Sequence, residues 1–118
     1  MSVYELLRRR RTIRRFQQQA VPLITLRKIA DSGRMGPSAM NLQPWEFIIV
    51  DRPELVAAIF EHTNWAGYLP REQGRPQPGQ APTAFIVVLK NERLSSKWSY
   101  HDIGAAVENM ILAALEEG

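Results

Sequence analysis

The sequence predicts an α+β fold, in which several helices pack with a small sheet. Apolar residues recur at helical spacing in four segments, and two short apolar runs have the length and composition of strands. The resulting order is helix, helix, strand, helix, strand, helix. The 118 residues, of which 45% are hydrophobic and 23% charged, are enough for one folded domain and too few for two.

Two helices are predicted in the N-terminal third. Residues 2–9 form the first, because Ser2 can cap it, Glu5 stands at its third position and apolar residues follow at helical spacing. The second runs from about Thr25 to Arg34, with Thr25 as its cap, and glycines mark its C-terminal end. The basic segment between the two helices is predicted to be non-helical.

A strand and a third helix follow a polar loop. Trp45–Val50 alternates and then becomes apolar, which is typical of a strand. The next helix starts at Asp51 and reaches about His62. We expect Asp51 to cap this helix and Glu54 to complete a capping box, with a proline in the first turn.

The second half of the chain combines a long loop with two regular elements. Prolines and glycines within residues 63–82 predict an irregular segment, and a loop of this length is usually functional or flexible. Residues 83–90 are apolar on both faces, which predicts a central strand. Residues 102–116 form a last helix. We expect Asp102 to cap it, and because it is apolar nearly all round we expect it to be buried.

These elements do not close a core by themselves, because two strands cannot cover so much apolar helix surface. We therefore expect the chain to be the first part of a larger α+β domain, or a subunit that is completed in an oligomer. The broad apolar surface of residues 102–116 favours a homodimer.

The composition excludes several classes of protein. Without cysteine, the chain has no disulfide, no thiolate metal site and no cysteine nucleophile. Its longest apolar run, residues 84–89, is far shorter than the ~20 residues that a membrane-spanning helix needs. The N-terminal residues lack the apolar region of a signal peptide. We therefore expect a cytoplasmic protein that does not enter a membrane.

Positive charge is concentrated near the N-terminus. Residues 1–50 contain nine Lys and Arg against three Asp and Glu, and six arginines fall within residues 8–15. The segment Arg10–Arg14 combines guanidinium groups, which bind phosphate bidentately, with a hydroxyl group. This pattern indicates a clamp for a phosphate ester. A solvated basic segment or a contact with nucleic acid agrees with it equally well.

A second polar segment, Pro37–Trp45, separates the second helix from the first strand. Ser38, Asn41 and Gln43 offer donors and acceptors suited to a polar ring edge or a polyol, and Ala39 allows a close approach. The side chains of such a loop can also satisfy the loop's own backbone. On the residues alone, this second interpretation is favoured.

Signs of a catalytic side chain or a metal site are missing from the sequence. Two histidines without cysteine are too few for a common zinc site. His101 stands beside Asp102, and we interpret the pair as an exposed histidine next to a helix cap. Paired carboxylates, a nucleophile elbow and a glycine-rich phosphate loop are absent. We therefore predict neither a catalytic side chain nor a bound metal.

Two segments, in this order, resemble motifs of the nitroreductase-like flavoproteins. Arg10–Phe16 resembles the "RRSxRxF" opening of that family. Pro37–Trp45, followed by a strand, resembles the more specific "PSxxNxQPWxF" segment. Downstream, Trp65–Leu69, Ala81-Pro82 and Asp102–Ala114 look like the family's middle loop, the start of a strand and the long dimer helix. The resemblance covers essentially the whole chain.

The resemblance implies a three-layer α+β fold with a mostly antiparallel sheet, which is incomplete at the C-terminus here. Residues 1–118 would then form part of a single FMN-binding domain. The protein would be a homodimer with FMN at its interface. It would pass electrons from NADH or NADPH through the flavin to a small acceptor, such as a nitroaromatic or a quinone. Family members are longer, and their C-terminal part supplies further flavin contacts.

By match to the two motifs, nine residues would bind the flavin. Arg10 would hold the phosphate, and Arg11 and Thr12 would line the phosphate and ribityl region. Arg14 would approach the ribityl chain or the pyrimidine edge. From the partner subunit, the same flavin would be reached by Pro37, Ser38, Ala39 and Asn41, with Gln43 behind them. A cation near the N1/O2 edge stabilises the anionic reduced ring, and the cofactor itself supplies the hydride chemistry, so no side-chain acid or base is required.

Two other functions stay open. The chain could be a catalytically incompetent fragment that binds flavin or has a structural role, or it could be a basic module that binds nucleic acid. Against nucleic acid, aromatic residues do not alternate with the arginines, and residues 51–118 are acidic. Turnover of NAD(P)H by the chain would separate an enzyme from an inactive fragment.

Overall fold

The computed structural model describes all residues from 1 to 118, and these divide into two structural units. Unit 1 consists of Met1–Arg10, Pro22–Ile49 and Ile86–Gly118, and unit 2 consists of Arg11–Val21 and Val50–Phe85. None of the helices is both long and apolar enough to cross a membrane.

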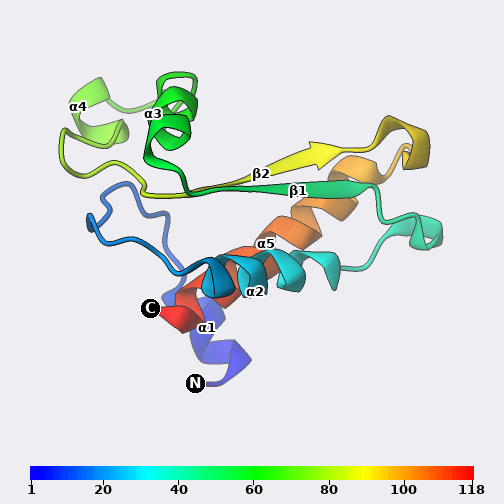
Figure 1. Cartoon of the computed structure of the whole chain (residues 1–118). Helices are drawn as coiled ribbons and strands as arrows, with labels where there is room; N and C mark the ends of the chain where they lie inside the picture. Colours follow the sequence, from blue (N-terminus) through cyan, green and yellow to red (C-terminus); the bar gives the residue numbers. More distant parts are fainter. The chain divides into compact units, whose positions relative to one another are not determined.

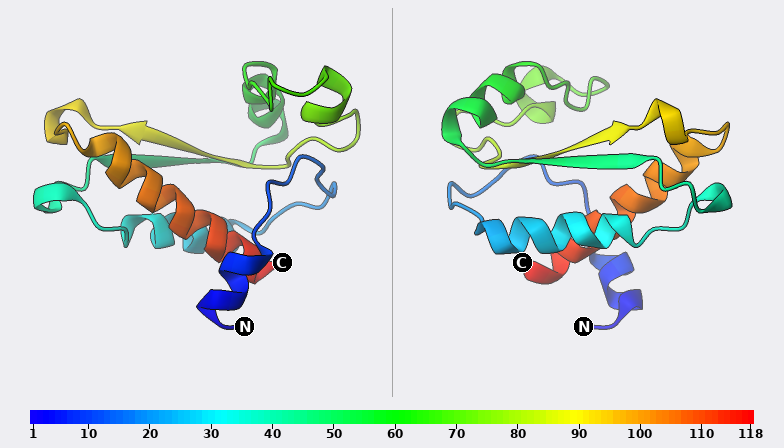
Figure 2. Two further views of the ribbon diagram at one scale, coloured as in Figure 1. Left: turned by 180° about the vertical axis from the view of Figure 1, so that it is seen from behind. Right: turned by 45° about the vertical axis from the view of Figure 1, so that its right-hand side comes forward.

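Unit 1 contains a two-stranded antiparallel sheet with helices on one face. Its elements are α1 (Val3–Arg9), α2 (Leu23–Arg34), the 3-10 turn η1 (Ala39–Asn41), β1 (Trp45–Val50), β2 (Phe85–Lys90), the 3-10 turn η2 (Glu92–Leu94) and α5 (Ser99–Glu117). The end residues Val50 and Phe85 of the two strands belong to unit 2. Helices α2 and α5 lie under the same face of the sheet in every view (Figures 1 and 2). This arrangement confirms the predicted α+β class.

The core of unit 1 lies where α2, α5 and β1 meet. A Cβ atom added to Gly33 of α2 would lie 2.9 Å from Cγ of Met110 on α5 and 3.0 Å from Cζ of Phe47 on β1. The missing side chain therefore lets the three elements approach one another. The surrounding buried apolar side chains are Leu26, Ile29, Trp45, Ala106 and Met110.

The predicted start of α1 is confirmed in detail. The Ser2 hydroxyl accepts a hydrogen bond from the Glu5 N–H (3.2 Å), and the Glu5 carboxylate accepts one from the Ser2 N–H (2.7 Å). The two bonds form a reciprocal capping box. At the far end of α1, the Arg10 N–H donates to the Leu6 carbonyl and closes the last turn.

The predicted caps of the next two helices are wrong. Helix α2 begins at Leu23, so Pro22 rather than Thr25 precedes it, because the fixed φ of proline already orients the chain for a helix. Helix α3 (Pro53–Glu61) has its proline at the first helical position, which places the cap at Arg52 instead of Asp51. The Arg52 side chain then pairs with Glu54 at 2.7 Å, so the predicted capping box does not form.

Two predictions about the C-terminal half also need correction. Strand β2 pairs only with β1, so it is not central, and most of its residues are half-buried. Helix α5 begins at Ser99 with Trp98 as its cap, so Asp102 lies inside the first turn and does not cap the helix. Only one stripe of α5 is buried in this chain, while Ile111 on another face is 39% exposed.

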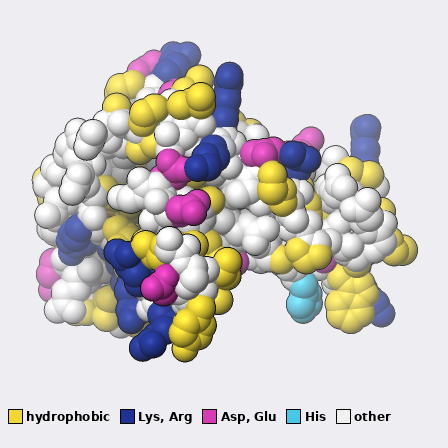
Figure 3. All heavy atoms as spheres, turned by 90° about the horizontal axis from the view of Figure 1, so that it is seen from below, with side chains coloured by type: hydrophobic (Ala, Val, Ile, Leu, Met, Phe, Trp, Pro, Cys, Tyr) yellow, Lys and Arg dark blue, Asp and Glu magenta, His cyan; other side chains and the backbone are white.

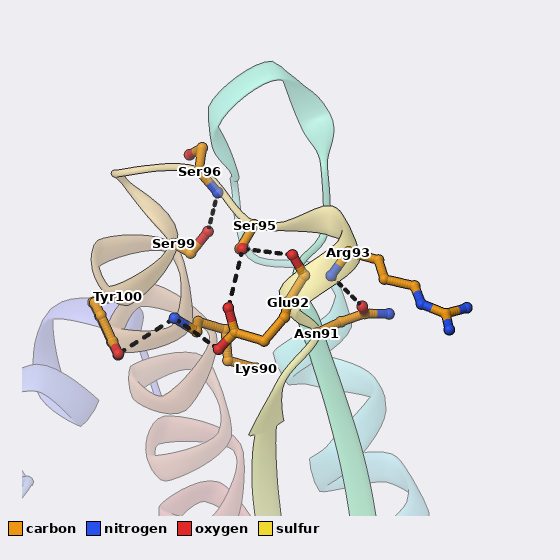
Figure 4. A network of polar contacts seen from close by, with 8 residues as sticks. All are labelled: Lys90, Asn91, Glu92, Arg93, Ser95, Ser96, Ser99 and Tyr100. Atoms are coloured by element: carbon orange, nitrogen blue, oxygen red, sulfur yellow. Dashed lines mark hydrogen bonds and ion pairs between the residues drawn. The ribbon is translucent and has the colours of Figure 1, made fainter.

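A polar network fixes the connection from β2 to α5 (Figure 4). Lys90 lies 3.1 Å from a carboxylate oxygen of Glu92 and donates to the Tyr100 hydroxyl at 3.3 Å. The bond to Glu92, and then the one to Tyr100, raise the pKa of Lys90. The Ser99 hydroxyl accepts from the Ser96 N–H at 2.7 Å. These contacts hold the first turn of α5 against the end of β2.

Unit 2 is organised by arginine and aromatic side chains. It contains α3 and a short helix, α4 (Arg71–Gly74), which lies inside the segment predicted to be irregular. The Arg75 guanidinium donates to the carbonyls of Phe60 and Thr63 at the end of α3 and lies 4.1 Å from the centre of the Phe60 ring. The Trp65 ring contacts the rings of Phe60 and Phe16, both at 6.1 Å between centroids.

Candidate functional site

The nine predicted site residues fall into two groups that belong to different units. Arg10 and the loop residues Pro37, Ser38, Ala39, Asn41 and Gln43 lie in unit 1. Arg11, Thr12 and Arg14 lie in unit 2. The structure therefore brings the loop residues together, and each arginine is best understood from its contacts within its own unit.

The loop at residues 37–43 has an unusual backbone. Met40 and Asn41 have φ values of 54°, and Gln43 has a φ of 51°. None of these residues is glycine, and this left-handed conformation costs such residues roughly 1–2 kcal/mol each. Non-glycine residues in this region occur mostly where surrounding contacts enforce them, often at ligand-binding loops. The sequence could not reveal this strain, because the three residues have ordinary side chains.

Hydrogen bonds inside the loop account for part of its polar side chains. The Ser38 hydroxyl accepts from the Gln43 N–H at 3.0 Å, and the Gln43 amide donates to Oδ1 of Asn41 at 2.9 Å. The interpretation that such a loop satisfies its own backbone is thus partly correct. The NH₂ group of Asn41 and the side-chain oxygen of Gln43 are not used in these bonds, and both residues are exposed. Ser38 and Ala39 are half-buried, and Pro37 is exposed.

Contacts from neighbouring elements hold the loop on three sides. The Asp102 carboxylate on α5 accepts from the Ala39 N–H, with both oxygens at 3.3 Å. The Pro44 carbonyl accepts from the Asn91 N–H at 2.7 Å. At Gly36, an added Cβ would lie 3.2 Å from Cα of Ala106. The loop is therefore fixed against the first half of α5 and the end of β2.

Arg10 lies at the C-terminal end of α1, beside α5. Its Nε is 3.9 Å from a carboxylate oxygen of Glu108, and both side chains are partly exposed. Glu108 and the loop anchor Asp102 are six positions apart on α5, which corresponds to about 9 Å along the helix axis. Basic side chains gather over α1 beside exposed apolar ones (Figure 3). This surface suits an anionic ligand.

The arginines of unit 2 have distinct environments. Arg14 is half-buried, and its Nη2 donates to the Tyr68 hydroxyl at 3.0 Å. Arg15 instead donates to the backbone carbonyls of Arg14, Glu72, Gln73 and Arg75. Arg11 and Thr12 are exposed. Arg14 and Arg15 are therefore adjacent in the sequence, but Arg14 binds a side chain whereas Arg15 binds the backbone.

Unit 2 also contains two surface hollows, of about 450 and 430 Å³, and both are lined by Arg71 and Arg75. Neither is lined by a predicted site residue. The chain contains no group of three or more His, Cys, Asp or Glu side chains placed to hold a metal ion.

Three residues that contact the predicted site were not predicted. Tyr68 bonds Arg14 across 54 positions of sequence, and no local signal announces such a contact. Glu108 is one of several acidic residues on α5, and its spacing does not single it out. Asp102 was noticed as a helix cap, whereas it binds the Ala39 N–H. The sequence gives no signal for this contact, because Ala39 and Asp102 are 63 positions apart.

A family model and individual relatives give a consistent comparison. The model described as "Nitroreductase family" matches residues 7–118. The chain belongs to the nitroreductase family. A protein of Methanothermobacter thermautotrophicus, provisionally named an NADH dehydrogenase/NAD(P)H nitroreductase, is 33% identical over 116 residues, which cover 97% of this chain and 56% of the relative. The chain thus spans about half the length of that curated relative.

Two other similar proteins have different names. An iodotyrosine deiodinase of Thermotoga neapolitana is 39% identical over 132 residues, which cover 98% of this chain and 69% of the relative. A provisionally named nitroreductase of Desulfovibrio desulfuricans, solved in complex with FMN, superposes with a TM-score of 0.74 at 29% identity. That alignment covers 98% of this chain and 63% of the other. The expected nitroreductase fold is therefore confirmed, as an α+β arrangement of helices and a small antiparallel sheet.

Proposed function

We propose that this chain is the FMN-binding part of an oxidoreductase that passes electrons from NADH or NADPH through bound flavin to a small acceptor, such as a nitroaromatic or a quinone. The observation that supports it most directly is the loop at residues 37–43. Three left-handed, non-glycine residues and three external contacts fix this loop while its amide side chains face solvent. A strained, anchored loop with exposed amides is suited to bind the polar edge of a ring.

The donors present fit the chemistry of FMN. A guanidinium binds phosphate bidentately, which suits Arg10, with Arg11 and Thr12 beside it in the chain. Arg14 uses one donor on Tyr68, and a guanidinium has five, so it can also bind a ribityl hydroxyl or the pyrimidine edge. From the partner subunit, the ring would meet the loop through Pro37, Ser38, Ala39, Asn41 and Gln43. When bound, FMN supplies the hydride chemistry.

The chain's own residues would bind and orient the flavin and adjust its electrostatics. A positive charge near the pyrimidine edge favours the anionic reduced ring, which is the role we give to Arg14. The loop amides would fix the position of the ring edge. We assign no side chain as a proton donor or acceptor.

A homodimer is part of the proposal. An exposed face of α5 includes Ile111, Ala114 and the glycine at 104. An apolar stripe of this kind on a long helix is suited to a second copy. Measuring the molar mass in solution by light scattering tests this point, and a strict monomer would refute the proposal of a flavin site shared by two subunits.

We also retain a cytoplasmic location as a prediction.

The contacts of the basic segment support a small ligand rather than nucleic acid. The Arg15 guanidinium is used on backbone carbonyls, Arg14 bonds Tyr68, and Arg10 lies beside Glu108. Fewer arginines are then available to follow a phosphate backbone.

The second alternative, an inactive fragment that binds flavin, differs from the proposal only in turnover. NAD(P)H oxidation by the flavin-loaded chain therefore decides between them.

The first test is a visible spectrum of the purified chain after incubation with FMN and desalting. We expect the flavin bands to stay with the protein. Arg10→Ala should weaken FMN binding by about 1.5–3 kcal/mol, because it removes a charge-assisted contact. Arg27→Ala, which removes an equal charge from an exposed position of α2, serves as the control and should leave the affinity unchanged. Equal affinities in all three proteins would refute the assignment of Arg10.

A further inference from the structure

Asp102 is the one acidic side chain that the structure buries. Its exposed fraction is 8%, and none of the five ion pairs includes it. A buried carboxylate without a cation is costly unless hydrogen bonds compensate for the lost water. An apolar side chain of similar size would fill the same space more easily. We therefore expect the Asp102 side chain to have a hydrogen-bonding role and not only a packing one.

The recorded partner of the Asp102 side chain is the N–H of Ala39, at 3.3 Å from each carboxylate oxygen. Asp102 lies in the first turn of α5, where the helix dipole favours a negative charge. The network of Lys90, Tyr100 and Ser99 fixes that turn against the end of β2 (Figure 4). The carboxylate is thus held on a rigid support and directed at one backbone donor of the loop.

The Ala39 N–H lies at the start of the strained part of the loop. Ala39 is the first residue of η1, and the left-handed Met40 and Asn41 follow it directly. Strained residues persist only where several contacts enforce them. Inside the loop the Ser38 hydroxyl supplies one such contact, and at its end the Pro44 carbonyl supplies another. The bond from Asp102 is the one that fixes where the strained turn begins.

We propose that Asp102 is a positioning residue for flavin binding. Through the Ala39 N–H it holds the loop at residues 37–43 in the conformation that presents Asn41 and Gln43 to the ligand. Asp102 does not touch the ligand in this proposal. The inference rests on the proposed FMN function for its ligand, but the bond between Asp102 and the loop is testable without any ligand.

Two substitutions of Asp102 separate hydrogen bonding from packing. Asp102→Asn keeps the shape and one oxygen acceptor, whereas Asp102→Leu fills the space without an acceptor. Ala39→Pro removes the donor from the other side. Proline is acceptable at the first residue of a helical turn, and Ser38 before it is extended, with φ −145° and ψ 148°. Glu116→Ala removes an exposed carboxylate of α5 and is the matched control.

The first readout is amide hydrogen exchange of the full chain without ligand. We expect the Ala39 N–H to exchange about tenfold faster in Asp102→Leu than in the original chain, as loss of one hydrogen bond implies. Exchange in Asp102→Asn and Glu116→Ala should stay close to the original rate. An unchanged Ala39 rate in Asp102→Leu overturns the proposal. If that variant does not fold, Asp102→Asn decides, because it keeps an oxygen acceptor: a tenfold rise in its Ala39 exchange rate would overturn the proposal.

The second readout is FMN affinity from the quenching of flavin fluorescence. Asp102→Leu should bind FMN roughly tenfold more weakly, and Asp102→Asn should retain most of the affinity. In the Ala39→Pro background, Asp102→Leu should add no further loss, because the two changes remove the same bond. Additive losses would show that Asp102 acts by another route and would overturn the proposal.

The two readouts distinguish the inference from the proposed function. If the original chain binds no FMN while Ala39 exchange responds as expected, the proposed function fails and the anchoring by Asp102 stands as a property of the loop. If FMN binds tightly and equally to Asp102→Leu, the proposed function stands and the positioning role is refuted.

Discussion

The loop at residues 37–43 and the segment at residues 63–82 are held in place by opposite kinds of hydrogen bond. In the first, acceptor side chains bind backbone N–H groups: Asp102 binds Ala39 and Ser38 binds Gln43. In the second, arginines bind backbone carbonyls, as Arg15 does at the end of α4. The first loop therefore depends on acceptor side chains and the second on donor side chains, so the two should be destabilised by different substitutions.

This difference changes how the basic segment is understood. Six arginines within eight residues suggest one anion-binding surface. The structure instead gives them different contacts. Arg15 binds backbone carbonyls of unit 2, whereas Arg10 lies beside Glu108 and Arg14 bonds Tyr68, and both of these arginines are partly exposed. A count of charges cannot separate these roles, since the carbonyls of Glu72, Gln73 and Arg75 lie 57 to 60 positions away from Arg15.

The largest effect is expected for Arg15→Ala. The change removes hydrogen bonds to the carbonyls of Glu72, Gln73 and Arg75, of which the bond to Arg75 is part-buried and the other two are exposed. A hydrogen bond to a charged group contributes about 1.5–3 kcal/mol, and partial exposure reduces the sum, so we expect a loss of about 2–4 kcal/mol in unfolding free energy. Urea unfolding measures the loss, and limited proteolysis should show faster cleavage within residues 63–82.

Arg71→Ala is the control for this prediction. Arg71 is exposed on α4 and its side chain donates no hydrogen bond to a backbone carbonyl, so its replacement changes the charge of unit 2 equally without removing such a contact. We expect its effect to stay within about 0.5 kcal/mol. Equal losses in the two variants would mean that charge, and not the bonds to carbonyls, stabilises the segment.

A smaller effect is expected for Gly36→Ala at the base of the first loop. The added Cβ would lie 3.2 Å from Cα and 3.3 Å from N of Ala106, and 3.3 Å from the Gly33 carbonyl oxygen. These are backbone atoms of two helices, which cannot rotate away as a side chain can. The loop must therefore shift relative to α5, at a cost of about 1–3 kcal/mol in unfolding free energy.

Gly104→Ala is the matched comparison on α5 itself. An added Cβ there meets no atom within 4 Å, so the usual preference of a helix for alanine should raise the unfolding free energy by about 0.5–1 kcal/mol. Urea unfolding of both variants gives the two signs. A Gly36→Ala protein as stable as the original would show that the loop is not held tightly against α5.

Local signals predicted the elements well, and long-range contacts account for what they missed. The capping box at Ser2 and the limits of β1 follow from neighbouring residues, and both are confirmed. The caps at Thr25 and Asp51 were wrong because a nearby proline decides where each helix starts. Helix α4 was not predicted, because its single turn is held by Arg15, which lies far away in the sequence and donates to the Glu72 carbonyl.

The candidate site shows the same division. The loop was predicted as a candidate site because the spacing of its motif residues is specific, and its role in binding stays a prediction. The strained φ angles of Met40, Asn41 and Gln43 could not, since contacts from α5 and β2 enforce them. Family resemblance supplied the ligand, and only the folded chain shows that Asp102 supports the loop.

The smallest effect is expected at the start of α1, where the chemistry of the first loop recurs in an exposed setting. There too a carboxylate accepts a hydrogen bond from a backbone N–H: the Glu5 carboxylate accepts from the Ser2 N–H, but both groups are exposed. The pKa of Glu5 is lowered from its ordinary value of 4.5, first by the hydrogen bond from the Ser2 backbone and then by that from the Ser2 side chain. A lowered pKa in the folded state means that the ionised form stabilises α1, so the contribution is present above pH 4.5 and is lost as the pH falls through the folded-state pKa.

We therefore expect Glu5→Ala to reduce the helical chemical shifts of α1 at neutral pH. The loss of stability should be smaller than for Arg15→Ala or Gly36→Ala, and the difference in chemical shift from the original chain should disappear as the pH is lowered. Salt should weaken the difference as well, because the pair is exposed to solvent. A difference that does not change with pH would show that the ionised Glu5 carboxylate does not stabilise the helix and that the Ser2 hydroxyl alone caps it.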